Sequence, residues 1–237
     1  MVMRSEAMET ARLLQRPDLW RANDLVVDAH PGLPTGYAAL DEELPGGGWP
    51  VGELTELLGD DHGCGEVSLL LPTLARISRN TGWVIWVAPP ARLNLPALAA
   101  AGVITPRMLM VDANSPAECA WALRQGLESG ACTALMGWLD TIDGALLRRL
   151  QLAARETSVP VFLFRPARSA LSASPAPLRL QLSAGPEQSL RIEILKRRGR
   201  PASQPVCLYT RPALPASPTV RIPRTALTQV TRMVRTA

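Results

Sequence analysis

The chain of 237 residues is almost without lysine: of its 25 basic residues only Lys196 is a lysine, and all the others are arginines. A phosphate-binding loop of the form G-x-x-x-x-G-K-[ST] needs a lysine at the start of a helix. No residue before Lys196 can supply it, so the sequence excludes a standard nucleotide-hydrolysing loop. A protein-kinase site or a Schiff-base lysine would also have to use Lys196.

Three further absences narrow the class of protein. The chain has no apolar run of about 18 residues, which a membrane-spanning helix requires. The first 24 residues carry four acids and no continuous apolar stretch, so we expect no signal peptide. The four cysteines are too far apart for a C-x-x-C metal pair and are typical of free thiols in a reducing compartment. These features predict a cytoplasmic protein without a membrane anchor or a metal site.

The charge is unevenly distributed along the chain. Residues 191–237 contain ten basic residues and one acid, a formal charge of +9, whereas residues 1–190 carry −5. An acidic body with a basic end favours contact between the C-terminal region and an anionic partner, either nucleic acid or an acidic protein surface. A basic tail that is only solvated is the alternative. The hydrophobic content of 47% is sufficient for one core of ordinary size.

The hydrophobic pattern predicts an α/β fold. Apolar strands are expected at residues 51–58, 83–88, 108–112, 131–139 and 159–164, with helices between them at 66–78, 96–101, 116–128 and 143–157. Strands that are apolar throughout and alternate with helices indicate a mostly parallel, twisted sheet covered on both faces. Residues 178–182 and 190–194 alternate with period two, which predicts an antiparallel hairpin with one wet face.

The chain divides into three regions on this pattern. Residues 1–30 contain a short amphipathic helix at 6–15 and a connector, and residues 31–200 form the α/β core. Residues 201–237 begin with six prolines in 23 residues, which predicts an extended basic tail, and residues 225–235 favour a short basic helix.

The segment at residues 33–59 carries a family resemblance. It contains LPTG at 33–36, Leu40-Asp41, GGGWP at 46–50 and a strand that ends in Gly59. This segment resembles the entry into the phosphate loop of RecA-type recombinases, and the order of elements up to about residue 200 is similar as well. The resemblance implies a RecA-like core.

The phosphate loop itself departs from the RecA pattern. Its glycines are Gly59, Gly63 and Gly65, but Glu66 stands where the lysine is needed, and Asp60 adds negative charge. Pro89-Pro90 replaces the glutamate that activates water, and Gly137-Trp138 replaces the aspartate that binds magnesium. We therefore expect a pseudo-ATPase with no catalytic residue, no cofactor and no metal. Asp140 and Asp143 could together hold a metal ion, but Asp143 is better explained as a helix N-cap.

The reversed charge in the loop, the GGGWP segment and the basic tail are most similar to the ImuA family of SOS mutagenesis proteins; SulA cell-division inhibitors share the core in shorter form. The resemblance implies an adaptor for ImuB and an error-prone replicative-type DNA polymerase, with RecA and DNA as further candidate partners. A DNA-binding accessory module and a SulA-like division inhibitor are the alternatives. Trp49 follows three glycines and is expected to be exposed. The candidate partner- or nucleic-acid-binding residues are Lys196, Arg197, Arg198, Arg200, Arg221, Arg224, Arg232, Arg235 and Trp49.

Overall fold

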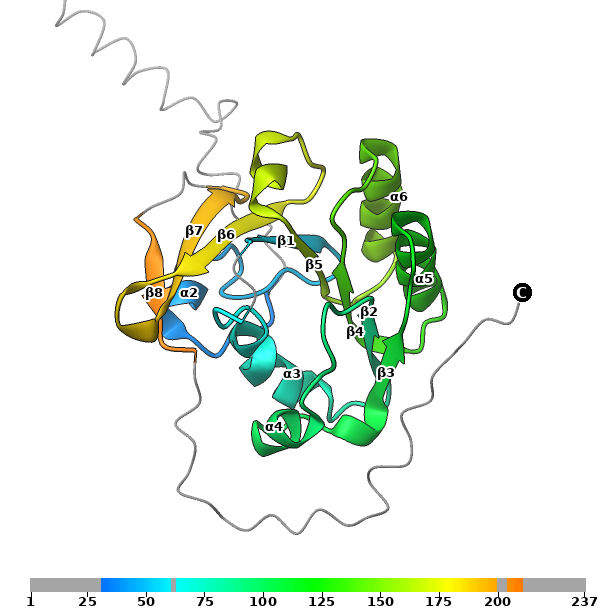
Figure 1. The fold of residues 1–237 in the computed structure, drawn as a ribbon, viewed down its shortest axis with the longest axis horizontal. Coiled ribbons are helices and arrows are strands. Elements are labelled where there is room, and N and C mark those ends of the chain that lie inside the picture. The colour runs from blue at the N-terminus through cyan, green and yellow to red at the C-terminus, as the bar shows by residue number, and fades with distance from the viewer. Residues whose placement is uncertain (1–30, 61–62, 200–203, 211–237) are drawn as a thin grey trace, which may run out of the picture.

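The computed structural model describes residues 31–60, 63–199 and 204–210 (Figure 1). Its strands are β1 (Leu54–Leu58), β2 (Trp83–Val87), β3 (Met108–Val111), β4 (Cys132–Trp138), β5 (Val161–Arg165), β6 (Leu178–Ala184), β7 (Leu190–Lys196) and β8 (Val206–Leu208). The α-helices are α2 (Ala38–Asp41), α3 (Leu71–Ile77), α4 (Leu95–Ala100), α5 (Pro116–Glu128) and α6 (Gly144–Arg155). Short 3-10 helices are η2 (Ser68–Leu70), η3 (Thr105–Arg107), η4 (Ala167–Leu171) and η5 (Pro186–Gln188). No helix within these ranges is long and apolar enough to cross a membrane.

The strands form one sheet in the order β3-β2-β4-β5-β1-β6-β7-β8. The six strands from β3 to β6 pair in parallel, whereas β7 is antiparallel to β6 and β8 is antiparallel to β7. The predicted mostly parallel α/β sheet and its antiparallel hairpin are therefore confirmed.

Helices cover both faces of this sheet. Val84 and Trp86 of β2 pack in one apolar cluster with α3 and α4, and Ile85 and Val87 pack in the other with α5 and α6. Successive side chains of a strand point to opposite faces, so the two clusters lie on opposite sides. Figure 1 shows α5 and α6 side by side, away from α3 and α4.

Local sequence signals explain where the helices start. The predicted helix at 66–78 is a short 3-10 turn, η2, followed by α3, and Pro72 lies in the first turn of α3, where its missing N–H is tolerated. Ser115 Oγ accepts a hydrogen bond from Glu118 N at 3.2 Å at the start of α5. Asp143 Oδ1 accepts one from Ala145 N at 3.2 Å, which confirms Asp143 as the N-cap of α6.

The C-terminal part of the sheet differs from the prediction in two ways. The hairpin strand β6 has no continuous wet face, because its Arg179 turns inward to Glu56 and to the backbone of η4 and is only 6% exposed. The core extends beyond residue 200, where the tail was predicted to begin, since β8 adds a further strand beside β7. The helices predicted at 6–15 and 225–235 lie outside the described residues.

Candidate functional site at the carboxyl edge of the sheet

A cavity of about 540 Å³ lies where the parallel strands end. Residues that follow β1, β2, β4 and β5 line it, together with the start of α5. In open α/β sheets this carboxyl edge is where ligands bind. The cavity therefore occupies the position in which the sequence predicted a degenerate nucleotide site.

The predicted phosphate loop is closed by its own glutamate. Both carboxylate oxygens of Glu66 accept hydrogen bonds from Gly63 N, at 3.0 and 3.1 Å, and Oε2 also accepts one from Gly65 N at 3.1 Å. The two glycines have φ angles of 81° and 112°, a region that disfavours other residues. Loop N–H groups of this kind bind phosphate in nucleotide-binding proteins. Here the Glu66 carboxylate accepts these hydrogen bonds in place of a phosphate. Glu66 and Gly59 both line the cavity.

Aromatic rings fill the side of the cavity where a magnesium-binding aspartate would be expected. Trp138 stacks on Phe164 with ring centroids 4.4 Å apart, and on Trp86 at 5.9 Å. Cys119 Sγ donates to the carbonyl oxygen of Trp138 at 3.4 Å. Burial raises the pKa of the Cys119 thiol to about 12, so this thiol is not a nucleophile at neutral pH.

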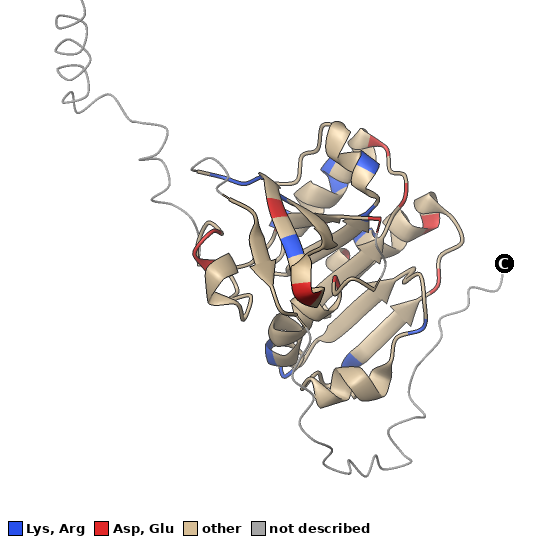
Figure 2. Cartoon of the chain, turned by 60° about the vertical axis from the view of Figure 1, so that its left-hand side comes forward, with Lys and Arg blue, Asp and Glu red and all other residues tan. Residues whose placement is uncertain are grey.

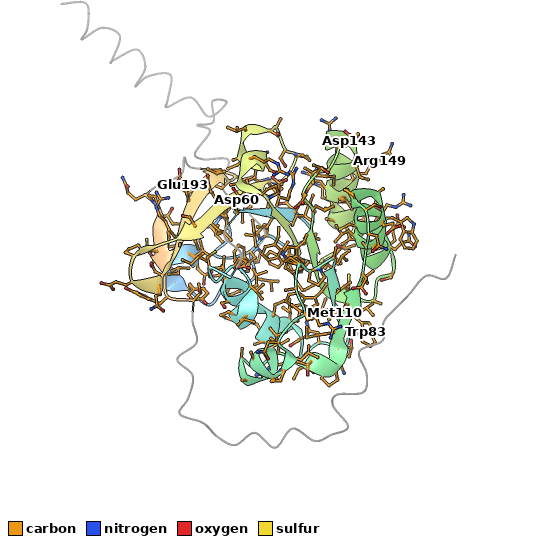
Figure 3. The ribbon with its side chains drawn as sticks, viewed as in Figure 1. Asp60, Trp83, Met110, Asp143, Arg149 and Glu193 are labelled. Carbon is orange, nitrogen blue, oxygen red and sulfur yellow. The ribbon has the colours of Figure 1, made fainter. Side chains whose placement is uncertain are left out.

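The described carboxylates near the cavity lie apart from one another. Asp140 lines the cavity, but Asp143 caps α6. Figure 3 places Asp143 at the outer end of α6, away from Asp60. Within the described ranges no group of three or more histidine, cysteine or acidic side chains could hold a metal ion.

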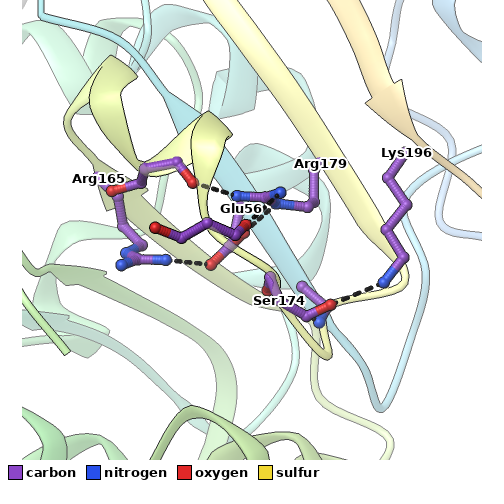
Figure 4. Close-up of polar contacts among 8 residues, drawn as sticks. Glu56, Arg165, Ser174, Arg179 and Lys196 are labelled. Atoms are coloured by element: carbon purple, nitrogen blue, oxygen red, sulfur yellow. Dashed lines mark hydrogen bonds and ion pairs between the residues drawn. The ribbon is translucent and has the colours of Figure 1, made fainter. Parts of the chain in front are cut away.

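A buried cluster of three charges beside the cavity was missed by the sequence analysis (Figure 4). Arg165 Nη1 donates to Glu56 Oε1 at 2.6 Å, and Arg179 Nε donates to Glu56 Oε2 at 2.5 Å. Glu56 is 0% exposed. The sequence did contain a signal for this cluster, because a glutamate between Leu54 and Leu58 on the buried face of a strand requires a partner. Its two arginines lie more than 100 residues away, and only the sheet brings them together.

The prediction that Trp49 is exposed is wrong. Its side chain is 0% exposed, and its indole Nε1 donates to Thr73 Oγ1 at 3.0 Å. The ring also meets Phe162 edge-on, with centroids 5.3 Å apart. The three glycines do not expose the tryptophan; Gly48 allows the loop to lie against the backbone of Leu33, where an added Cβ would be only 2.1 Å from the carbonyl oxygen. In this fold Trp49 is a core residue and is not a partner contact.

The basic cluster at the end of β7 is largely engaged within the chain. Arg197 pairs with Glu43 at 2.6 Å, and its side chain is 2% exposed. Arg198 pairs with Glu53 at 2.5 Å but is 59% exposed, and the exposed Lys196 donates to Ser174 O at 2.8 Å. Burial of Arg197 contradicts its prediction as a binding residue, whereas Lys196 and Arg198 remain accessible.

The other predicted binding residues, Arg200, Arg221, Arg224, Arg232 and Arg235, lie outside the described residues. In the view of Figure 2, basic and acidic residues are interspersed over the described elements, with no single continuous basic face.

Comparisons with known proteins agree with the resemblance seen in the sequence. The family model "Cell division inhibitor SulA" matches residues 52–159. The SulA protein of Serratia marcescens is 26% identical over 117 residues, which cover 49% of this chain and 70% of that protein. Protein ImuA of Caulobacter vibrioides (strain NA1000 / CB15N) is 30% identical over 131 residues, which cover 53% of this chain and 54% of the relative.

Among solved structures, the crystal structure of SulA from Pseudomonas aeruginosa matches with a TM-score of 0.41 and 26% identity, over 48% of this chain and 97% of that chain. By its sequence matches the chain is homologous to ImuA and SulA proteins, which confirms the predicted resemblance to these two families. The alignment spans about half the length of the ImuA relative.

Proposed function

We propose that this chain is a non-catalytic, RecA-like adaptor in the SOS response to DNA damage. It binds ImuB and an error-prone DNA polymerase during translesion synthesis, with RecA as a further partner. The observation that carries the proposal is the Glu66 carboxylate on the amides of Gly63 and Gly65, in the loop where an ATPase would bind phosphate. Homology to ImuA supports the pathway. The succession of β1, a glycine loop and alternating helices and strands supports a RecA-like core.

Electrostatics explains why such a loop would not bind a triphosphate. A unit charge at 4 Å contributes about 4 kcal/mol near a protein surface, and Glu66 reverses the sign of the expected lysine. A phosphate would also have to displace the carboxylate from the two amides. Asp60 lines the same cavity and adds further repulsion. We therefore expect no turnover of ATP.

An ATPase assay of the full chain, with and without single-stranded DNA, tests this part of the proposal. The expected rate equals that of a buffer blank in both conditions. Turnover that co-elutes with the protein and changes in Glu66→Lys would overturn the assignment as a pseudo-ATPase, because contaminating enzymes do not respond to that substitution.

Partner capture tests the adaptor role. The full chain and a chain truncated after Thr210 should be compared as baits for ImuB, the polymerase and RecA. Truncation at this point retains β8 and the buried Thr210, which is 4% exposed, so the sheet stays intact. We expect the full chain to retain ImuB and the polymerase. Failure of both baits to retain either protein would refute the adaptor role.

Two other functions give different results in the same experiments. The SulA family match at residues 52–159 favours a division inhibitor, which would bind FtsZ. A DNA-binding module would show an affinity for DNA that falls steeply with salt, with a slope set by the number of phosphate contacts. If truncation after Thr210 removes partner binding but leaves DNA affinity unchanged, the basic tail is a protein-binding segment.

A further inference from the structure

The last described residue, Thr210, lies against the predicted phosphate loop. Thr210 is 4% exposed, and a Cβ added to Gly65 would be only 2.4 Å from its Oγ1. Gly65 lines a second, apolar cavity of about 400 Å³. Its neighbour Glu66 lines both this cavity and the one at the carboxyl edge. The chain after Thr210 therefore begins beside two adjoining cavities.

The apolar cavity favours aliphatic side chains as its occupants. Its walls include Val67, Leu71, Leu93, Leu98 and Trp138. An aliphatic side chain that enters such a space removes apolar surface from water on both sides of the contact. Burial of one leucine or valine strengthens binding about tenfold or more.

The walls of the two cavities carry more unpaired acid than unpaired base. Their acids are Asp60, Glu66 and Asp140, and their bases are Arg92, Arg165 and Arg168. The Arg165 side chain is 7% exposed and is paired with Glu56, so three carboxylates face two exposed arginines. Asp140 is exposed and has no hydrogen-bond or ion-pair partner among the described residues. The rim thus favours a cation next to the apolar occupant.

The chain that continues from Thr210 has both properties. Residues 211–237 contain five arginines and no acid. Within them, the predicted basic helix at 225–235 has apolar residues at the spacing of one helix face, namely Leu227, Val230 and Val234. Arg235 ends this segment.

The covalent link makes this segment the favoured occupant. Residues 211–224 span up to about 46–50 Å when extended, which is enough to reach from Thr210 into both cavities. A short link holds its segment at an effective concentration on the order of 1 mM. A contact with a dissociation constant of about 0.1 mM between separate molecules would then be about 90% occupied within one chain.

We propose that residues 225–235 of the chain's own C-terminal tail dock over the two cavities. Leu227, Val230 and Val234 enter the apolar cavity, and Arg235 pairs with Asp140 at the rim. The docked segment covers the edge at which open α/β sheets bind ligands, so a partner that uses this edge has to displace it. This inference goes beyond the adaptor function and does not depend on it.

The scarcity of lysine makes a direct test possible. In the full chain, Arg235→Lys adds one lysine to the natural Lys196. A carbodiimide joins a lysine amine to a carboxylate with loss of water only where the two groups are in contact. We expect tandem mass spectrometry of the monomer to find the new amine joined to Asp140.

Two matched double variants of the lysine-bearing chain separate docking from mere proximity. Leu227→Asn with Val230→Asn, the segment variant, removes apolar side chains from the docking face. Leu214→Asn with Val220→Asn, the link variant, makes the same changes in the connecting residues. We expect the segment variant to lower the yield of the cross-link at least tenfold and the link variant to leave it within about twofold.

Three outcomes of the cross-linking experiment would overturn the inference. The first is the absence of a cross-link at Asp140 in the parent chain, the second is an equal yield in the two double variants, and the third is a cross-link that occurs only in covalent dimers. The third outcome would mean that the tail docks on a second copy.

The indole signal of Trp138 gives an independent readout, because this residue lines both cavities. In a ¹H–¹⁵N spectrum of the full chain the signal is assigned by its loss in Trp138→Phe. We expect the substitutions of the segment variant, without the added lysine, to shift this signal, and those of the link variant to leave it in place. A signal that stays in place in both, or shifts equally in both, would contradict docking at the cavities.

Discussion

Substitution of Glu56 by glutamine should destabilise the fold severely. Among the described residues, the Glu56 carboxylate, 0% exposed, is the acidic group that pairs with Arg165 and Arg179, whose side chains are each 7% exposed. Removing the anionic partner of a buried ion pair leaves an uncompensated charge and costs about 3–5 kcal/mol. Since a domain has a total stability of about 5–15 kcal/mol, Glu56→Gln is expected to lose a large part of it.

The two arginines should respond differently to substitution by methionine. Arg179→Met removes the ion pair with Glu56 and also the hydrogen bonds to the carbonyl oxygens of Ser169 and Ser172, so we expect a loss of about 3–5 kcal/mol as well. Arg165→Met leaves the neutral pair of Glu56 and Arg179 in place and removes the buried Nε that has no partner in the described chain. Its cost should be smaller, about 1–3 kcal/mol, because Glu56 Oε1 loses its donor while the charge of Glu56 stays paired.

Urea unfolding at pH 7, followed by circular dichroism and tryptophan fluorescence, measures these free energies. Glu193→Gln is the control, because its ion pair with Arg191 is 40–47% exposed and should contribute about 0–1 kcal/mol. If Arg165→Met cost as much as Glu56→Gln, or if Glu56→Gln cost less than the control, the reasoning that one buried carboxylate compensates two buried arginines would be refuted.

Three further predictions concern the edges of the cavity. Glu66→Gln should weaken the loop by about 0.5–2 kcal/mol, as for the loss of a helix cap, and hydrogen exchange at Gly63 N should become faster. At pH 8 Cys119 should not react with a disulfide reagent in the folded protein, because its pKa of about 12 leaves roughly one molecule in ten thousand as thiolate; the exposed Cys207 should react at once. Ser115→Ala should cost about 1 kcal/mol in urea unfolding, since it removes the N-cap of α5.

The elements of the fold could be predicted because their signals are local. β2 and β5 are apolar runs bounded by turns, and the caps Ser115 and Asp143 directly precede the helices that they start. Contacts within a few residues determine such features, so a single sequence contains them. β8 was missed because three residues in a proline-rich segment carry no pattern of their own, and only β7 gives them a partner.

Burial of individual loop side chains could not be predicted, because it depends on residues far away in the sequence. Trp49 is covered through Thr73 and Phe162. Arg197 is covered through Glu43, 154 residues earlier in the chain. A glycine-rich loop and a basic strand end both indicate exposure when only their neighbours are considered. In both cases the tertiary partner reverses that expectation.

The reversed charge at Glu66 was visible in the sequence, but its consequence for the site depends on the geometry. The sequence showed only that a negative charge replaces a positive one. The structure adds that this charge is already bonded to the loop amides, so the part of the edge that resembles a phosphate loop needs no external anion. The donor without a partner among the described residues, Arg165 Nε, lies instead inside the buried cluster, which has one more cation than anion.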